Sequence, residues 1–458
     1  MTLHLVRRPL GARSAPARVS SAAAWSLPLL AALAGAPGEA VADGSDWPQW
    51  RGPDRNGIAA AALPDTLPAT LEPRWRVEVG EGHSSPVVAG DRVYVHARRG
   101  EREVVAALEL ATGKEMWAHT VETPYQMNPA ARGHGKGPKS TPVIAGDHVC
   151  TFGISGTLTC LDRVTGEVRW SKSFEGRWEA TAPDFGTALS PLVVAAPDGR
   201  DLLIAHVGGV RRGALTAFAL EDGAEVWSWD GDAPSYASPM PFTIDGVAQV
   251  VTQSRDHLVA VDAASGELLW SRPFSTAFVQ NIVTPVAAGG GVIVFSGLAE
   301  DVFALRPRRN GESWSVEEVW RNQDLPMYMS SPVLVGDAVA GNAGGAVEDA
   351  GDEVAAGTLY GFTHKNRGQL FALDAATGAT LWTSEGRLGE NASLVVAGDR
   401  LLALLDGGEL LVAPATREGW QPLGRYPVAE SATWAHLVVL DGRLLVKDAT
   451  TLALFVVD

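Results

Sequence analysis

The feature that most constrains this chain is an internal repeat. An apolar stretch, a short turn ending in glycine and a tryptophan four residues later recur along its 458 residues. Self-similarity of this kind indicates a fold built from copies of one supersecondary unit. The clear copies are AALELATGKEMW (106–117), TCLDRVTGEVRW (159–170), TAFALEDGAEVW (216–227), VAVDAASGELLW (259–270) and FALDAATGATLW (371–382), with degenerate copies beginning at 303 and 410.

Each copy predicts two strands joined by a tight turn. The Asp or Thr side chain of the turn can accept hydrogen bonds from nearby amides, and the glycine supplies a left-handed residue. We therefore expect Asp162, Asp262 and Asp374 to be turn residues rather than a set of catalytic carboxylates. The recurring tryptophan is expected to pack against the next copy of the unit.

A second phrase precedes each copy and occurs eight times. It is an apolar strand, a G-D or D-G turn and another apolar strand, as in SSPVVAGDRVYV (84–95) and STPVIAGDHVCT (140–151). The two phrases together give four short antiparallel strands per unit. Four-stranded units of about 40–50 residues are typical of β-propeller blades. The sequence predicts an all-β, eight-bladed β-propeller.

The two ends of the chain are expected to close the ring together. The last unit stops at its third strand, within 452–458, while the segment PRWRVEV before the first blade can supply the fourth, at about 74–79. Trp75 would then occupy the recurring tryptophan position. We expect one propeller domain over 74–458, with the acidic, low-complexity segment 340–357 inserted as a surface loop.

The first 42 residues read as an export signal. A basic start that includes Arg7 and Arg8, a short apolar run at 22–34 and a small-residue cleavage site at 40–42 give the usual three parts. The apolar run is too short for a comfortable membrane span. The protein is therefore expected to be exported, periplasmic or secreted, with the general and twin-arginine routes both open.

Residues 43–73 are expected to be an N-terminal clasp. SDWPQWRGPDRNG (45–57) lies between the cleavage site and the closing strand. Trp47 and Trp50 are interpreted as anchors on the propeller, and Arg51 as a partner for a backbone or carboxylate oxygen.

The two cysteines, Cys150 and Cys160, flank a short hairpin. They oppose each other only if its loop has an odd number of residues, so a disulfide stays open. The formal charge of −16 argues against a nucleic-acid partner, and we expect a monomer. The sequence contains no haem-attachment, paired C-x-x-C, G-x-S-x-G or H-E-x-x-H motif.

The [A/C]-x-D-x-x-[T/S]-G-x-x-x-W phrase resembles the repeat of the pyrroloquinoline-quinone (PQQ)-like propellers. Residues 45–458 share this resemblance, and WPQWRGPDRNG (47–57), GHGKGPKSTP (133–142), LYGFTHKNRGQLFALDAATG (359–378) and GENASLVVAGD (389–399) resemble exported bacterial members. That superfamily includes quinoprotein alcohol dehydrogenases and BamB, the non-catalytic lipoprotein of outer-membrane assembly. The resemblance is therefore specific for the fold but not for the activity, because the superfamily includes both enzymes and non-catalytic proteins.

Loops that enter the innermost strands should converge at one mouth of the central channel. They carry bases, amides and aromatic rings, as a polar ligand site would. The open alternative is that these groups satisfy backbone atoms around a wet channel. The candidate residues are His83, His134, Lys136, Lys139, Tyr236, Gln280, Asn281, Tyr328, Asn391, Trp434 and His436.

Two functions follow from the resemblance. A PQQ dehydrogenase needs a cation held by oxygen ligands, a carboxylate base and planar surfaces around the quinone. In many enzymes of the family one surface is a disulfide between adjacent cysteines, which this chain lacks, and the cation ligands find no match here. We expect a binding or interaction scaffold of the cell envelope, for a small molecule or an envelope protein. The alternative is an oxidoreductase that uses PQQ and a divalent cation such as Ca²⁺, with its site at the channel mouth.

Overall fold

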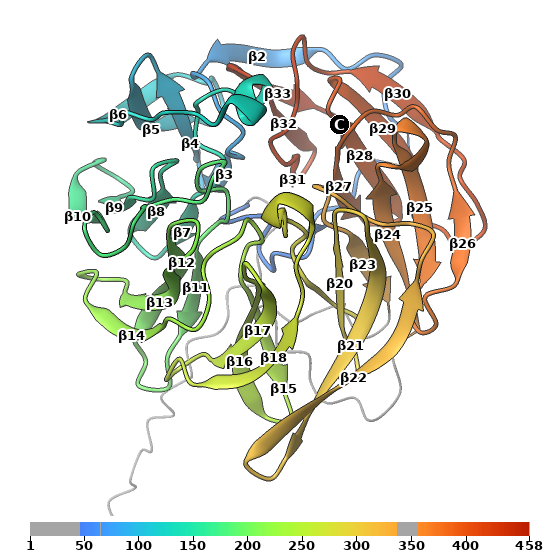
Figure 1. Ribbon diagram of the computed structural model, residues 1–458. Helices are drawn as coiled ribbons and strands as arrows, with labels where there is room; N and C mark the ends of the chain where they lie inside the picture. The colour runs from blue at the N-terminus through green and yellow to red at the C-terminus, as the bar shows by residue number, and fades with distance from the viewer. Residues whose placement is uncertain (1–45, 65, 337–355, 458) are drawn as a thin grey trace, which may run out of the picture. The chain divides into compact units, whose positions relative to one another are not determined.

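The computed structural model describes residues 46–64, 66–336 and 356–457 (Figure 1). These residues form eight antiparallel sheets arranged in a ring, so the predicted eight-bladed β-propeller is confirmed. In each blade the strands follow one another in chain order from the centre of the ring outward. The exceptions are blades 7 and 8, to which the N-terminal segment adds one strand each. No helix in the described ranges is long and apolar enough to cross a membrane.

Blades 1 to 4 each use four consecutive strands. They are β3 (Val87–Ala89), β4 (Arg92–Arg99), β5 (Arg102–Glu109) and β6 (Glu115–Glu122); β7 (Val143–Ala145), β8 (His148–Phe152), β9 (Leu158–Asp162) and β10 (Val168–Lys172); β11 (Leu192–Ala195), β12 (Asp201–Gly208), β13 (Gly213–Ala219) and β14 (Glu225–Trp229); and β15 (Met240–Ile244), β16 (Val247–Gln253), β17 (His257–Asp262) and β18 (Leu268–Pro273).

Blades 5 to 8 complete the ring, and three 3₁₀ helices lie in loops. The strands are β19 (Val286–Ala287), β20 (Ile293–Gly297), β21 (Glu300–Asn310) and β22 (Ser313–Asn322); β23 (Val333–Gly336), β24 (Gly357–Thr363), β25 (Gln369–Asp374) and β26 (Thr380–Thr383); β27 (Ala392–Ala397), β28 (Arg400–Leu405), β29 (Glu409–Pro414) and β30 (Gly424–Pro427) with β1 (Ile58–Ala59); and β31 (Val438–Leu440), β32 (Arg443–Lys447) and β33 (Thr451–Val456) with β2 (Pro73–Glu78). The 3₁₀ helices are η1 (Pro129–His134), η2 (Ala277–Val279) and η3 (Lys365–Arg367).

The last blade is shared by both ends of the chain, as predicted. Strand β2 pairs antiparallel with β33, with Trp75 opposite Leu454 and Glu78 opposite Thr451. Figure 1 shows blue β2 as the outer strand of the red blade. Because β2 occupies the position of a fourth strand, the last blade is complete and one sheet joins the N-terminal and C-terminal parts of the propeller.

The recurring tryptophans join neighbouring blades. The indole of Trp75 covers Gly113, which has φ +73°, and a Cβ there would lie 2.8 Å from Trp75 Cε3. Glycine at this turn therefore serves both the backbone conformation and the close approach of the ring. Each indole Nε1 also donates to a carbonyl of the next blade: Trp75 to Leu110 (2.9 Å), Trp117 to Arg163 (3.3 Å), Trp170 to Leu220 (2.8 Å), Trp227 to Ala263 (3.1 Å), Trp320 to Ala375 (2.9 Å) and Trp382 to Thr416 (2.9 Å).

Trp270 departs from this pattern. Its Nε1 donates to Oε1 of Gln249 within its own blade, at 2.9 Å. The next blade carries the degenerate copy of the repeat, and its outer hairpin, β21 and β22, is the longest pair of strands in the described chain. The turn at Gly311 has no atom within 4 Å of the position of a Cβ, so no indole lies on it.

The turn aspartates have the structural role expected of them. Oδ1 of Asp162 accepts from the amides of Val164 and Thr165, both at 2.9 Å, and Asp262 and Asp374 make the same pair of contacts in their own turns. The carboxylates of these three aspartates therefore hold the turns in which they lie.

A ring of hydroxyl groups links the innermost strands. Most blades begin with Ser or Thr followed by Pro, and the hydroxyl accepts from the backbone N–H at the same position of the preceding blade. Such bonds satisfy buried amides that no strand pairs. The bonds run from Ser85 N to Thr141 Oγ1 (3.2 Å), Thr141 N to Ser190 Oγ (2.9 Å), Ser190 N to Ser238 Oγ (2.9 Å), Thr284 N to Ser331 Oγ (3.0 Å) and His436 N to Ser85 Oγ (2.6 Å).

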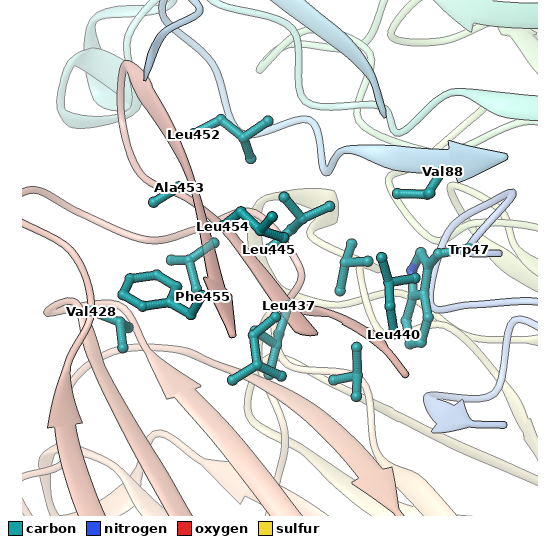
Figure 2. Close-up of a cluster of buried hydrophobic side chains, with 14 of the residues drawn as sticks. Trp47, Val88, Val428, Leu437, Leu440, Leu445, Leu452, Ala453, Leu454 and Phe455 are labelled. Atoms are coloured by element: carbon teal, nitrogen blue, oxygen red, sulfur yellow. The ribbon is translucent and has the colours of Figure 1, made fainter. Parts of the chain in front are cut away.

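The N-terminal segment crosses the centre of this ring. Trp47 exchanges backbone hydrogen bonds with Val88 of blade 1, and β1 pairs in parallel with β27 of blade 7. Figure 1 shows this blue segment within the ring of blades. Trp47 is 1% exposed and packs in a cluster that includes Val88, Leu437 and Leu440 (Figure 2).

Two fully buried arginines hold the same segment to the blades. Arg55 donates to the carbonyls of Pro191 (2.9 Å), Ser190 (3.1 Å) and Pro239 (3.2 Å), and Arg51 donates to that of Pro332. Burial lowers the pKa of both guanidinium groups to about 9, so both remain charged at neutral pH. Arg51 thus bonds backbone oxygens, one of the two partner types expected of it.

Cys150 and Cys160 form a disulfide. The two residues are direct partners in the β8–β9 hairpin, whose loop runs from 153 to 157. The odd loop length is the condition that the sequence left open. Both cysteines are buried.

Two sequence expectations lie partly or wholly outside the described residues. The export signal at 1–42 is outside them. So is the acidic segment at 340–357, apart from its last two residues. Gly336 and Gly357, which is the last residue of the segment, are paired between β23 and β24.

Candidate functional site

One position of the repeat lines a cavity at the mouth of the channel. It is the residue three places before the proline that opens each innermost strand, or before the leucine that replaces it in blades 7 and 8. The cavity has a volume of about 250 Å³. All eight copies of the position face it: His83, Lys139, Ala188, Tyr236, Ile282, Met329, Asn391 and Trp434.

The N-terminal segment provides the floor of this channel-mouth pocket. Trp50 lines it, and its Nε1 donates to Oγ1 of Thr284 at 3.2 Å. Its indole also contacts the ring of His436 edge-on, with 5.2 Å between ring centroids.

Blades 1 and 2 supply the basic groups of the pocket. Lys139 Nζ donates to the carbonyl of Phe185 at 2.7 Å, and burial lowers its pKa to about 8. His83 and His134 meet edge-to-face at 5.7 Å between centroids, and both approach the Trp434 ring, at 6.0 and 4.6 Å. These three rings form an aromatic wall next to the ammonium group of Lys139.

His83 is unusual because neither ring nitrogen makes a hydrogen bond of normal geometry in the described residues, although both atoms are buried. Burial first, and then the positive charge of Lys447, lowers its pKa to about 3. Burial also lowers the pKa of His134. At neutral pH both rings are therefore neutral, and each carries one N–H donor. Unpartnered buried donors are rare outside sites that bind a ligand or water.

Other polar side chains of the pocket have hydrogen-bond partners within the protein. Tyr328 donates from its hydroxyl to Oε1 of Gln280 at 2.6 Å, and Ser330 donates to Oδ1 of Asn391 at 2.7 Å. Tyr236 accepts from the amide of Phe185 at 3.2 Å, and burial raises its pKa above the usual tyrosine value. These bonds fix the rings and amides around the opening.

Eight of the eleven candidates named from the sequence therefore line the cavity. The other three lie elsewhere. Lys136 is partly exposed and pairs with Glu101 at 3.7 Å. Asn281 is buried and bonds the backbone of Thr276, Ser254 and Arg255, and His436 lies beneath Trp50. Their roles in the structure are to hold loops and the floor.

Sequence reasoning missed several lining residues. It selected polar side chains on the entering loops, so it passed over Ala188, Ile282 and Met329, which occupy the same repeat position. Aligning that one position across the eight copies is the signal that would have found them. Trp50 carried no such signal, because it precedes the first repeat.

The residues present do not fit a quinone with its divalent cation. Ca²⁺ is bound by oxygen ligands, usually including carboxylates. No carboxylate lines the pocket, and the amide oxygens of Gln280 and Asn391 already accept hydrogen bonds. In the described part of the chain no group of three acidic, His or Cys residues could hold a metal ion. The nearby basic side chains would also repel a cation.

Comparison with known proteins agrees with this fold. The PQQ_2 family profile, described as "Outer membrane protein assembly factor BamB", matches residues 66–126 and 101–348. The chain belongs to this family. This PQQ-like propeller is 25% identical over 292 residues to the outer membrane protein assembly factor BamB of Yersinia pestis, covering 63% of each chain. It is 28% identical over 150 residues to the polyvinylalcohol dehydrogenase of a Sphingopyxis species, covering 28% of this chain and 21% of that one. The propeller thus spans less than two-thirds of the length of these relatives.

Solved structures show the same architecture. BamB from Moraxella catarrhalis superposes with a TM-score of 0.56 at 15% identity, covering 84% of this chain and 98% of that one. The quinohemoprotein alcohol dehydrogenase of Comamonas testosteroni superposes with a TM-score of 0.55 at 16% identity, covering 90% and 80%. At these identities the likeness concerns the fold alone.

Proposed function

We propose that this PQQ-like propeller is an exported binding module of the cell envelope. Its channel-mouth pocket holds a small molecule or a group presented by an envelope protein. The observation that carries the proposal is that one repeat position from all eight blades, together with Trp50 of the N-terminal segment, lines a single cavity. A cavity lined by aromatic, apolar and a few polar groups is the usual form of a ligand site.

The lining favours binding over dehydrogenation. An oxidoreductase of the quinoprotein type needs a cation and a carboxylate base next to the quinone. The pocket offers Lys139, two histidines and hydrogen-bonded amides instead. The assembly role in the name of the Yersinia relative supports an envelope partner, and the signal-like segment 1–42 supports export.

The first experiment compares cofactor binding with simple ligand binding. Mature protein is mixed with PQQ and Ca²⁺, and quinone absorbance and dye-linked alcohol oxidation are followed; in parallel, calorimetry measures binding of naphthalene-2-methanol. We expect saturable binding of the aromatic probe, weakened by Trp434→Ala, and no oxidation. Dye reduction that requires both PQQ and Ca²⁺ would replace the binding role with the enzymatic one.

Export has its own test. The full chain and a chain without residues 2–42 are expressed in a Gram-negative host, and periplasmic and cytoplasmic fractions are probed. The full chain should accumulate in the periplasm in a shortened form. Retention of the full chain in the cytoplasm would contradict export.

A further inference from the structure

The pocket has two chemically different sides that face each other. In an eight-bladed ring, blades 1 and 2 lie opposite blades 5 and 6. His83 and Lys139 line the pocket from blades 1 and 2, whereas Ile282 and Met329 line it from blades 5 and 6. Blades 5 and 6 also line the pocket with four polar side chains, each of which is hydrogen-bonded within the protein: Gln280, Thr284, Tyr328 and Ser331. A ligand that spans the mouth therefore meets a basic wall at one end and, at the other, two apolar side chains among polar groups that already have partners.

We propose that the pocket binds an organic carboxylate with an apolar body. The carboxylate lies toward Lys139 and His83, and the body lies against Ile282 and Met329. This inference rests on the proposed function, that the channel mouth is a ligand site, and adds the charge and polarity of the ligand. The binding needs neither a metal ion nor a redox step.

Lys139 has donor capacity to spare. An ammonium group has three N–H bonds, and one of them is used by the carbonyl of Phe185. Burial is the cause of its lowered pKa, and no neighbouring carboxylate contributes to the shift. A carboxylate ligand would supply the missing counter-charge through charge-assisted hydrogen bonds, which are stronger than neutral ones.

His83 provides a second, independent indication. Both of its ring nitrogens are buried and make no hydrogen bond of normal geometry, although the ring approaches the backbone of His134, and the side chain lines the pocket. Its ring is neutral at pH 7, because burial and the charge of Lys447 hold its pKa near 3. The one N–H of a neutral imidazole can donate to a carboxylate oxygen next to Lys139. No carboxylate lines the pocket, and Asp184 and Glu390 are exposed. The negative charge of Glu390 acts on His134, where it opposes the lowering of the pKa by burial.

The opposite wall sets the second requirement. Ile282 and Met329 bring no hydrogen-bonding side chain to the pocket. A ligand that is polar on all sides would lose hydrogen bonds to water there without replacement, which is costly. The volume of about 250 Å³ admits a body the size of a bicyclic aromatic ring.

The experiment is a calorimetric titration with three probes that differ in one property each. Naphthalene-2-carboxylate has the charge and the body, naphthalene-2-methanol has the body alone, and acetate has the charge alone. We expect the naphthoate to bind about tenfold more tightly than the alcohol, since a charge-assisted bond exceeds a neutral one by that order. Acetate should show no saturable binding.

Matched variants assign the effect to the wall. Lys139→Met should weaken naphthoate binding about tenfold and leave the alcohol unchanged. Lys136→Met is the control, because it removes the same charge three residues away on a partly exposed side chain outside the pocket. Circular dichroism and the melting temperature establish that each variant is folded.

The pH dependence gives a second readout. Naphthoate affinity should fall between pH 7 and 9.5, because the pKa values of Lys139 and Lys447 are both lowered to about 8. The other titratable groups around the pocket are His83, His134, Tyr236, Tyr328 and the exposed carboxylates Asp184 and Glu390. The part of the pH effect that persists in Lys139→Met belongs to Lys447.

The outcomes separate the two proposals. Equal binding of naphthoate and alcohol, or naphthoate binding that Lys139→Met leaves intact, would overturn the carboxylate proposal while the pocket remains a ligand site. Failure of all three probes to bind would count against both. Tight binding of acetate alone would assign an anion site without the apolar requirement, and would also overturn the inference.

Discussion

The indole Nε1 of Trp50 donates to Oγ1 of Thr284 at 3.2 Å, although 234 residues separate the two along the chain. This contact joins the N-terminal segment to the residue that precedes the opening proline of blade 5. It also places the aromatic ring of Trp50 at the pocket. The same segment therefore fastens the propeller and forms the base of its candidate ligand pocket.

The buried arginine next to this floor should be important for stability. Arg55→Met removes the donors to the carbonyls of Ser190, Pro191 and Pro239 and leaves them buried. We expect a loss of about 3 kcal/mol in unfolding free energy, measured by urea denaturation. Arg200→Met, which breaks an exposed pair with Asp198, is the control and should leave the midpoint unchanged. Equal midpoints for the two variants would argue against the anchoring role.

The tryptophan–glycine contact between blades can be measured with a pair of glycines. Gly113→Ala and Gly100→Ala introduce a Cβ at similar positive φ values, +73° and +65°. Only the first places that Cβ against Trp75, so we expect losses of about 2–3 and about 1 kcal/mol respectively. Urea denaturation of both variants gives the comparison. If the two losses were equal, stacking on the glycine would contribute nothing beyond backbone strain.

Buried histidines should make the protein less stable in mild acid. Burial lowers the pKa of His206 to about 4, whereas an unfolded chain binds that proton near pH 6.5. The stabilising contribution is therefore full above pH 6.5 and falls by up to about 1.4 kcal/mol per unit as the pH drops toward 4. Unfolding free energies measured from pH 7.5 to 4.5 should decline, and His206→Gln should reduce the slope. A slope that this variant leaves unchanged would contradict the assignment.

The disulfide should contribute to stability and resist labelling. For a separation of 10 residues the chain-entropy estimate is about 3 kcal/mol. Alkylation of denatured protein followed by mass spectrometry should find no free thiol until a reductant is added, and Cys150→Ala/Cys160→Ala should unfold at lower urea. Two free thiols in protein from an oxidising compartment would rule out the bond.

The sequence was sufficient for the fold because every blade repeats the same local chemistry. The Asp turn, the glycine at Gly113 and its equivalents, and the tryptophan that covers it are determined within a dozen residues and by the next copy. Ring closure through Trp75 was predictable for the same reason, since the closing strand carries the repeat tryptophan.

The site was only partly predictable. Most of the polar residues named on the entering loops line the cavity. Lys136 and His134 lie three and five residues from Lys139, yet His134 lines the cavity and Lys136 does not. That difference depends on how η1 folds over the mouth. The contribution of Trp50 depends on contacts with blades more than 200 residues away, which no local pattern encodes.

The most direct test of this account is a crystal structure of the protein soaked with 6-bromonaphthalene-2-carboxylate, with the bromine located by anomalous scattering. We expect the bromine beside Ile282 and Met329, and the carboxylate within hydrogen-bond distance of Lys139 Nζ. A bromine found only outside the channel mouth, for instance in the small cleft lined by His96 and Glu103, would contradict the account.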